Sequence, residues 1–99
     1  MERRESNREE LGFQVEISME DGAIMCTLIN LSEVGALLRI NPEQNGIPTN
    51  DNLGEDVNFV LKQASAVDRE YTGEIIRLFY KDNAEFIALR FWEKYKELN

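Results

Sequence analysis

Apolar and polar side chains alternate over much of the chain, which is the two-residue period of strands that bury one face. The clearest run starts near residue 11, where single polar or small residues separate the apolar ones: Leu11, Phe13, Val15, Ile17 and Met19. Asp21-Gly22 follows this run and favours a tight turn, because both residue types tolerate positive φ. Residues 24–29 are predicted to form the returning strand, with Ile24, Cys26 and Leu28 on one face. The beginning of the chain is therefore predicted to form an antiparallel hairpin.

The remaining pattern predicts four more strands, which cover residues 36–40, 57–61, 71–80 and 86–91. Turn-forming residues fill the long loop predicted over 41–56 and the short turn at Asp82-Asn83. After the last strand, apolar residues recur at helical spacing among good helix formers, which predicts a short C-terminal helix between Trp92 and Leu98. Six short antiparallel strands separated by turns are typical of a small all-β barrel or sandwich.

Composition limits the classes of protein that fit this pattern. The 99 residues are 42% hydrophobic, which is enough for one domain with one core. Residues 1–10 are almost entirely polar and are predicted to be a flexible segment that carries arginines, and residues 11–99 to be the folded domain. The formal charge of −8 disfavours nucleic acid or an anionic membrane as a partner. No segment has the length of a membrane span, so we expect no membrane insertion.

Residues that commonly carry catalysis or bind metals are scarce. The chain has no histidine, which removes the commonest general base and the commonest metal ligand. Its one cysteine, Cys26, cannot form an internal disulfide and lies on the apolar face of a predicted strand. We therefore expect no enzyme activity, no metal site and no cofactor. The N-terminus shows no secretory signal, which favours a location in the cytoplasm.

Two short motifs suggest a site for a phosphorylated guanine nucleotide. The first is an Arg-x-x-x-Arg pair formed by Arg4 and Arg8, and the second is Asn-x-Ser-x-x-Gly at Asn30, Ser32 and Gly35. A guanidinium group can hold a phosphate, or the O6/N7 edge of guanine, through two parallel hydrogen bonds. The second motif combines a carboxamide, a hydroxyl and bare backbone in one turn. Each residue also has a structural explanation: solvated arginines, an Asx-turn asparagine, a capping serine and a glycine with positive φ.

These motifs resemble the signature of the PilZ domain family, which is Arg-x-x-x-Arg followed by Asp/Asn-x-Ser-x-x-Gly. Residues 71–77 are similar to the family's later Gly-x-Val-x-Arg strand, and residues 87–91 are similar to its closing strand, which ends in Arg-Phe. The resemblance covers nearly the whole chain in the right order. Three positions depart from the family pattern: Glu9 and Glu10 stand where an apolar residue or proline is usual, and Ala88 replaces a glycine.

The resemblance implies a six-stranded antiparallel β-barrel that binds the bacterial second messenger cyclic di-GMP. It assigns ligand binding to six residues: Arg3, Arg4, Arg8, Asn30, Ser32 and Gly35. By resemblance, the arginines belong to a flexible stretch that folds over the ligand, with the first as a helper that favours a stacked ligand pair. The other three residues lie on the barrel surface beneath it. Arg39 and Arg77 are candidates for supporting charge on neighbouring strands.

A receptor of this kind signals when the ligand orders its N-terminal segment and so creates a surface for a downstream protein partner. The family implies bacterial control of motility, exopolysaccharide or biofilm formation. Two other functions stay open from the sequence. One is a PilZ-like adaptor that binds proteins but no nucleotide, and the other is an oligonucleotide-binding barrel whose affinity falls steeply with salt.

Overall fold

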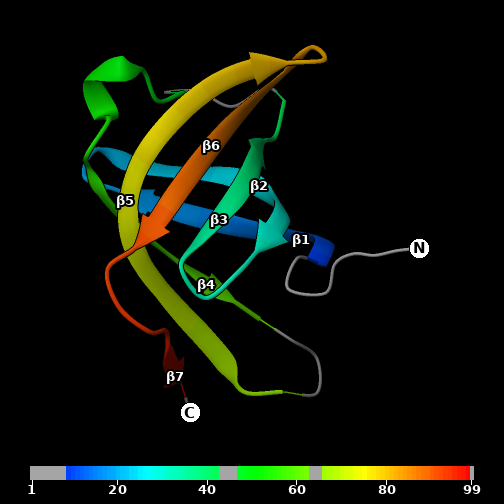
Figure 1. Ribbon diagram of the computed structural model, residues 1–99, viewed down its shortest axis with the longest axis vertical. Coiled ribbons are helices and arrows are strands. Elements are labelled where there is room, and N and C mark those ends of the chain that lie inside the picture. Colours follow the sequence, from blue (N-terminus) through cyan, green and yellow to red (C-terminus); the bar gives the residue numbers. More distant parts are fainter. Residues whose placement is uncertain (1–8, 43–46, 63–65, 99) are drawn as a thin grey trace.

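The computed structural model describes residues 9–42, 47–62 and 66–98, and in this part of the chain seven antiparallel strands form one sheet (Figure 1). The elements in chain order are β1 (Glu9–Met19), β2 (Gly22–Leu31), β3 (Gly35–Ile40), the 3-10 turn η1 (Asn50–Asn52), β4 (Asp56–Leu61), β5 (Asp68–Lys81), β6 (Ala84–Phe91) and β7 (Lys96–Leu98). The strand order is β4-β1-β2-β3-β6-β5-β7, and pairing of β4 with β5 closes six of the strands into a barrel. The predicted six-stranded antiparallel barrel is confirmed.

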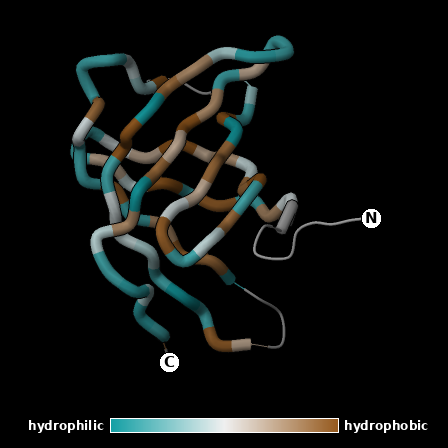
Figure 2. The backbone as a smooth tube through the Cα atoms, in the orientation of Figure 1, coloured by the Kyte–Doolittle hydropathy of each residue, from teal (hydrophilic) through white to brown (hydrophobic). Residues whose placement is uncertain are grey.

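The interior of the barrel holds one hydrophobic core. In Figure 2, hydrophobic residues follow the strands through the centre of the molecule, and hydrophilic residues dominate several turns. The largest fully buried side chains are those of Ile17, Ile24, Leu28, Leu38, Phe59, Leu61, Ile75 and Ile87. Alternation predicted this core because each strand turns one face to the interior and the other to solvent. Within the described residues, no helix is long and apolar enough to cross a membrane.

The strand β1 contains a bulge that the alternation did not indicate. Its pairing with β2 shifts register between Glu10 and Phe13, and Gly12 in this interval has a φ of 70°. Phe13, the first phenylalanine after the bulge, is 38% exposed, whereas Val15 is buried. β1 also begins at Glu9, two residues before the predicted start of the domain. The extra residue of a bulge is accommodated by glycine, which adopts this φ without steric cost.

The predicted C-terminal helix is wrong. Residues 92–95 form no helix, and Lys96–Leu98 is a strand that pairs with residues 68–70 of β5. Tyr95, just before β7, packs on Tyr71 with ring centroids 5.3 Å apart. A helix of so few residues is marginal in water on its own, so pairing and aromatic contacts with β5 decide the conformation instead.

Candidate functional site

The turn between β2 and β3 carries the Asn-x-Ser-x-x-Gly motif, and Ser32 holds it together. The backbone N–H of Ser32 donates to the carbonyl oxygen of Gly35 at 2.9 Å. The Ser32 Oγ accepts hydrogen bonds from the N–H groups of Val34 and Gly35, each at 3.2 Å, and donates to the Gly35 carbonyl at 3.3 Å. The hydroxyl is therefore already used within the turn. Of the two roles predicted for Ser32, these contacts support the capping one.

Gly35 is required by the packing of β3 against β6. Its Cα lies opposite Arg90, and a Cβ built at Gly35 would be 2.3 Å from the carbonyl oxygen of Leu89. The alternative that Gly35 adopts a positive φ is wrong, because the described glycines with positive φ are other residues. The N–H of Phe91 also donates to the carbonyl of Val34 at 2.8 Å. The motif turn is thus fixed to β6 through its backbone.

The three described motif residues meet at one shallow pocket of about 210 Å³ on the barrel surface. Its lining residues are Asn30, Leu31, Ser32, Gly35, Ala36 and Leu37. The first residues of β1 lie next to it, since Glu9 pairs with Leu31 and Glu10 pairs with Asn30 (Figure 1). The predicted ligand arginines, which are Arg3, Arg4 and Arg8, lie outside the described residues. The described chain therefore begins beside the pocket formed by the second motif.

Three arginines occupy the outer face of the strands that continue from this pocket. The residues Ala36, Leu38 and Ile40 point inward, so the odd-numbered positions of β3, including Arg39, face outward. On β6, Arg90 is the cross-strand partner of Gly35. The third arginine, Arg77 on β5, is the cross-strand partner of Ala88, an outward position of β6. Its guanidinium carbon lies 4.7 Å from the ring centroid of Phe79.

Arg39 and Arg77 are predicted from the sequence as supporting cations, but Arg90 is not. Its guanidinium forms an ion pair with Glu74 at 2.5 Å while its side chain stays 64% exposed. Alternation along β6 could have indicated it, because Ile87 and Leu89 are both core positions and Arg90 must then face outward. This ion pair holds the arginine on the outer face of the barrel, beside the motif turn.

Groups suited to catalysis or metal binding do not gather in the described part of the chain. Burial raises the pKa of the Cys26 thiol to about 12, so the thiolate that would act as a nucleophile does not form near neutral pH. No group of three or more His, Cys, Asp or Glu residues there has the arrangement of a metal site. Asn30, in contrast, combines donor and acceptor atoms at the pocket, which suits binding of a polar ligand.

Comparison with known proteins agrees with the barrel fold. The model of the PilZ domain matches residues 2–97. This chain belongs to the PilZ domain family. Its fold is similar to a solved structure described as the Bacillus subtilis inhibitor of motility (MotI/DgrA), with a TM-score of 0.70 and 18% sequence identity. That match covers 95% of this chain and 44% of the other, so this chain spans less than half the length of that protein. No curated protein sequence matches it. PilZ domains are binding and effector domains, and the family is generally one of cyclic di-GMP receptors.

Proposed function

We propose that this PilZ domain binds cyclic di-GMP between the β2–β3 turn and the arginines that precede β1. The observation that carries the proposal is the start of β1, where Glu9 pairs with Leu31, the residue before Ser32. Arg8 precedes Glu9 in the sequence, so the arginine motif is joined covalently to the chain beside the pocket. Membership of a family of cyclic di-GMP receptors supports the same ligand.

Each motif residue has a separate role in this proposal. Arg4 and Arg8 supply planar forks for a phosphodiester and for the O6/N7 edge of guanine, and Arg3 favours a second, stacked nucleotide. Asn30 supplies a carboxamide that both donates and accepts, as the guanine edge requires. Ser32 acts by keeping the turn closed, because its hydroxyl is engaged with the backbone.

Local positive charge has to outweigh the charge of the whole chain. The ligand is a dianion, and the chain carries a formal charge of −8. On the outer face of the barrel, Arg90 lies opposite Gly35 and is paired with Glu74, while Arg39 and Arg77 lie farther along β3 and β5. The positive charges of Arg39 and Arg77 add to those of the arginines in the N-terminal motif and favour an anion on this side of the barrel. Gly35 contributes by letting β3 approach β6 closely, which places Arg90 opposite the turn.

Binding is converted into a signal when the ligand joins the N-terminal segment to the barrel. Residues 1–8 contain no apolar side chain after Met1, so an anion that bridges the arginines to the turn supplies the free energy that orders them. The ordered segment and the barrel then form a composite surface for a downstream protein. The chain acts as a cytoplasmic bacterial receptor and not as an enzyme. A role in motility agrees with the name of the similar structure, an inhibitor of motility.

Calorimetric titration with cyclic di-GMP, GTP and cyclic di-AMP tests the ligand. We expect saturable heat with cyclic di-GMP alone. Arg4→Ala or Arg8→Ala is expected to weaken binding about 5- to 150-fold, the loss of one bidentate contact. Arg69→Ala is the matched control, because Arg69 is on β5, lies over the ring of Tyr95 and does not line the pocket of the motif turn. Heat with none of the three nucleotides would contradict the proposal and favour the adaptor.

Limited trypsin digestion tests the ordering step. Trypsin cleaves after Arg3, Arg4 and Arg8, and we expect saturating cyclic di-GMP to slow these cleavages while leaving cleavage after Lys62 unchanged. Mass spectrometry of the fragments at early times measures each site separately. If cyclic di-GMP binds but does not slow cleavage at the arginine sites, the proposed ligand stands and the proposed ordering step is contradicted.

A further inference from the structure

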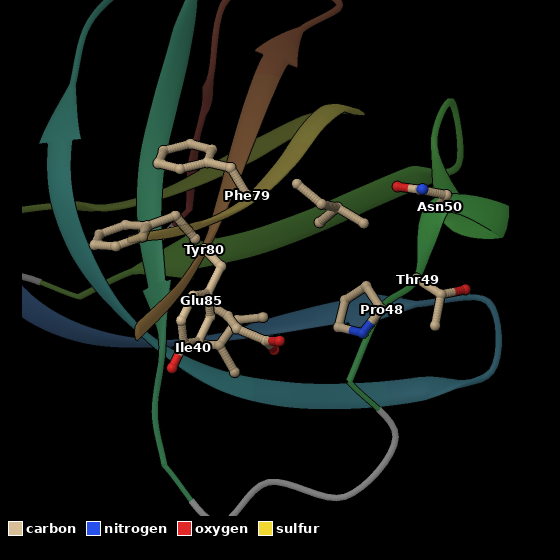
Figure 3. A pocket seen from close by; sticks show the side chains of 9 residues that line it. Ile40, Pro48, Thr49, Asn50, Phe79, Tyr80 and Glu85 are labelled. Atoms are coloured by element: carbon tan, nitrogen blue, oxygen red, sulfur yellow. The ribbon is translucent and has the colours of Figure 1, made fainter. Parts of the chain in front are cut away.

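A second opening lies under the β5–β6 hairpin, past the end of the barrel core (Figure 3). The hairpin side is formed by the side chains of Leu78, Tyr80 and Glu85, and the opposite side by Pro48, in the segment that precedes η1. Ile40, at the end of β3, also lines the opening and lies beside Tyr80 and Glu85. The opening has a volume of about 240 Å³ and continues into a neighbouring one of about 440 Å³, with which it shares three residues. Together they form the hairpin groove.

The hairpin groove contains a carboxylate oxygen without a hydrogen-bond donor. The Oε1 atom of Glu85 is inaccessible to solvent and has no partner among the described residues. The nearby hydroxyl of Tyr80 donates to the Oδ1 atom of Asn83, at 3.4 Å. Arg39 lines the continuation of the groove, but among the described residues it forms no ion pair with Glu85. A buried acceptor of this kind favours a donor that arrives with a ligand.

An unpaired strand edge runs along the same groove. On its β4 side, the last backbone bonds of β5 are from Gly54 N–H to the Ile75 carbonyl and from Ile75 N–H to the Glu55 carbonyl. From residue 76 to Lys81, the described partners of β5 are those of β6. Thr49 and Asn50 line the same opening as residues 78–80 of β5, so the groove lies along this free edge. An exposed edge offers backbone donors and acceptors to an added strand.

We propose that the hairpin groove binds an extended segment of a partner protein that carries a lysine or arginine between apolar residues. The segment pairs with the free edge of β5, and its cationic side chain pairs with the carboxylate of Glu85, which turns toward the opening so that Oε1 gains a donor. Apolar side chains two positions before and after the cation point to the same side of an extended chain and contact Ile40, Pro48 and Leu78. A formal charge of −8 favours encounter with a basic partner. None of these residues belongs to the motif turn, so the interaction does not require the nucleotide.

Selection of displayed random heptapeptides on the complete chain, without nucleotide, tests the proposal. Peptides that also bind Glu85→Gln are removed by counter-selection. The expected consensus has one Lys or Arg with apolar residues at the two positions i−2 and i+2. A selection without enrichment, or an acidic consensus, would overturn the proposal.

Calorimetry with a synthetic peptide of the selected sequence measures the contribution of the carboxylate. We expect Glu85→Gln to weaken binding about tenfold or more, as for loss of a hydrogen bond to a charged group. Glu93→Gln, an exposed acid outside the groove, is the control and should not change the affinity. Equal affinity for Glu85→Gln and the unmodified protein would contradict the role of Glu85. The thermal unfolding of Glu85→Gln is measured alongside and should match that of the unmodified chain.

Amide chemical shifts and hydrogen exchange locate the bound peptide. Shifts at residues 78–80 and at Glu85, with slower exchange along the free edge of β5, are the expected result. Shifts confined to another face of the barrel would overturn the assignment even if the peptide binds. Cyclic di-GMP binding is measured separately, so failure of this site leaves the nucleotide proposal intact.

Discussion

At the scale of single residues, the motif turn, which spans Asn30 to Gly35, combines structural and ligand-binding requirements. Ser32 and Gly35 are engaged in holding β2, β3 and β6 together, while Asn30 lines the pocket beside them. A substitution in this motif can therefore weaken ligand binding by disturbing the barrel. Stability has to be measured with every binding experiment at these positions.

Gly35→Ala is expected to destabilise the barrel even without nucleotide. The new methyl group would lie 2.3 Å from the carbonyl oxygen of Leu89, so β3 and β6 must separate, at a cost of about 1–3 kcal/mol. Gly73→Ala is a matched control outside the motif, because its methyl group would lie 2.2 Å from the carbonyl oxygen of Arg90. Urea unfolding measures both variants. An unchanged midpoint for Gly35→Ala would restrict the glycine to ligand binding.

Ser32→Ala is expected to lower the free energy of unfolding by about 1 kcal/mol. The variant leaves the N–H groups of Val34 and Gly35 without their side-chain acceptor. Ser18→Ala, at an exposed position of β1, should change stability by less than about 0.5 kcal/mol. Thermal unfolding of the two variants gives the comparison, and equal losses would remove the special role of the turn hydroxyl.

The buried thiol of Cys26 makes stability depend on pH in the alkaline range. Burial raises its pKa in the folded chain from 9.0 to about 12, so between these values the unfolded chain releases a proton that the folded chain retains. The contribution of this thiol to the free energy of unfolding is therefore fully present below pH 9. Above pH 9 it decreases, by at most about 1.4 kcal/mol per pH unit. Urea unfolding from pH 8 to 10.5 should show a steeper decline for the unmodified chain than for Cys26→Ala. Parallel curves would contradict this.

At the scale of elements, the tip of the β5–β6 hairpin is a two-residue turn of the predicted kind. Asp82 and Asn83 both have positive φ, of 53° and 64°, which favours glycine at the second position. Asn83→Gly should stabilise the chain by up to about 1 kcal/mol, and Asn83→Val should destabilise it by about 1–2 kcal/mol. A lower midpoint of thermal unfolding for Asn83→Gly than for the unmodified chain would show that the lost hydrogen bond from Tyr80 outweighs the backbone effect.

Strands were predictable from the sequence where one face of the strand enters the core. They were less predictable where pairing with a neighbouring strand decides the conformation. The runs around Val15, residues 57–61 and residues 86–91 alternate in the sequence and form β1, β4 and β6. The bulge at Gly12 depends on its pairing with β2. Local helix propensity after Phe91 lost to the pairing of β7 with β5, which a local pattern cannot contain.

At the scale of the whole molecule, an aromatic cluster packs where the pairing of β4 with β5 closes the barrel. Phe59 on β4 stacks on Tyr71 of β5 at 5.2 Å, and Tyr71 also contacts Phe91 at 4.9 Å and Tyr95 at 5.3 Å between ring centroids. These residues come from three strands and the C-terminal segment. Aromatic packing in the core therefore accompanies the pairing of β4 with β5 that closes the sheet.

Phe59→Ala should cost about 3–5 kcal/mol, a large share of the 5–15 kcal/mol (roughly) that stabilises a domain. Phe13→Ala is the control, because Phe13 is 38% exposed and Phe59 is 1% exposed. Urea unfolding of the two variants should give a much larger loss for Phe59. Similar losses would place the main packing contacts outside the closure between β4 and β5.

The sequence by itself determined the strand pattern, the core residues, the hairpin turns and the identity of the two motifs, because each depends on neighbours close along the chain. Only the tertiary structure decided that Asn30, Ser32 and Gly35 share a pocket beside the start of β1, and that Arg90 lies opposite Gly35. It also decided that Gly35 is needed for contact with β6. These features depend on pairing between residues far apart in sequence, and a local pattern contains no information about which strand becomes the neighbour.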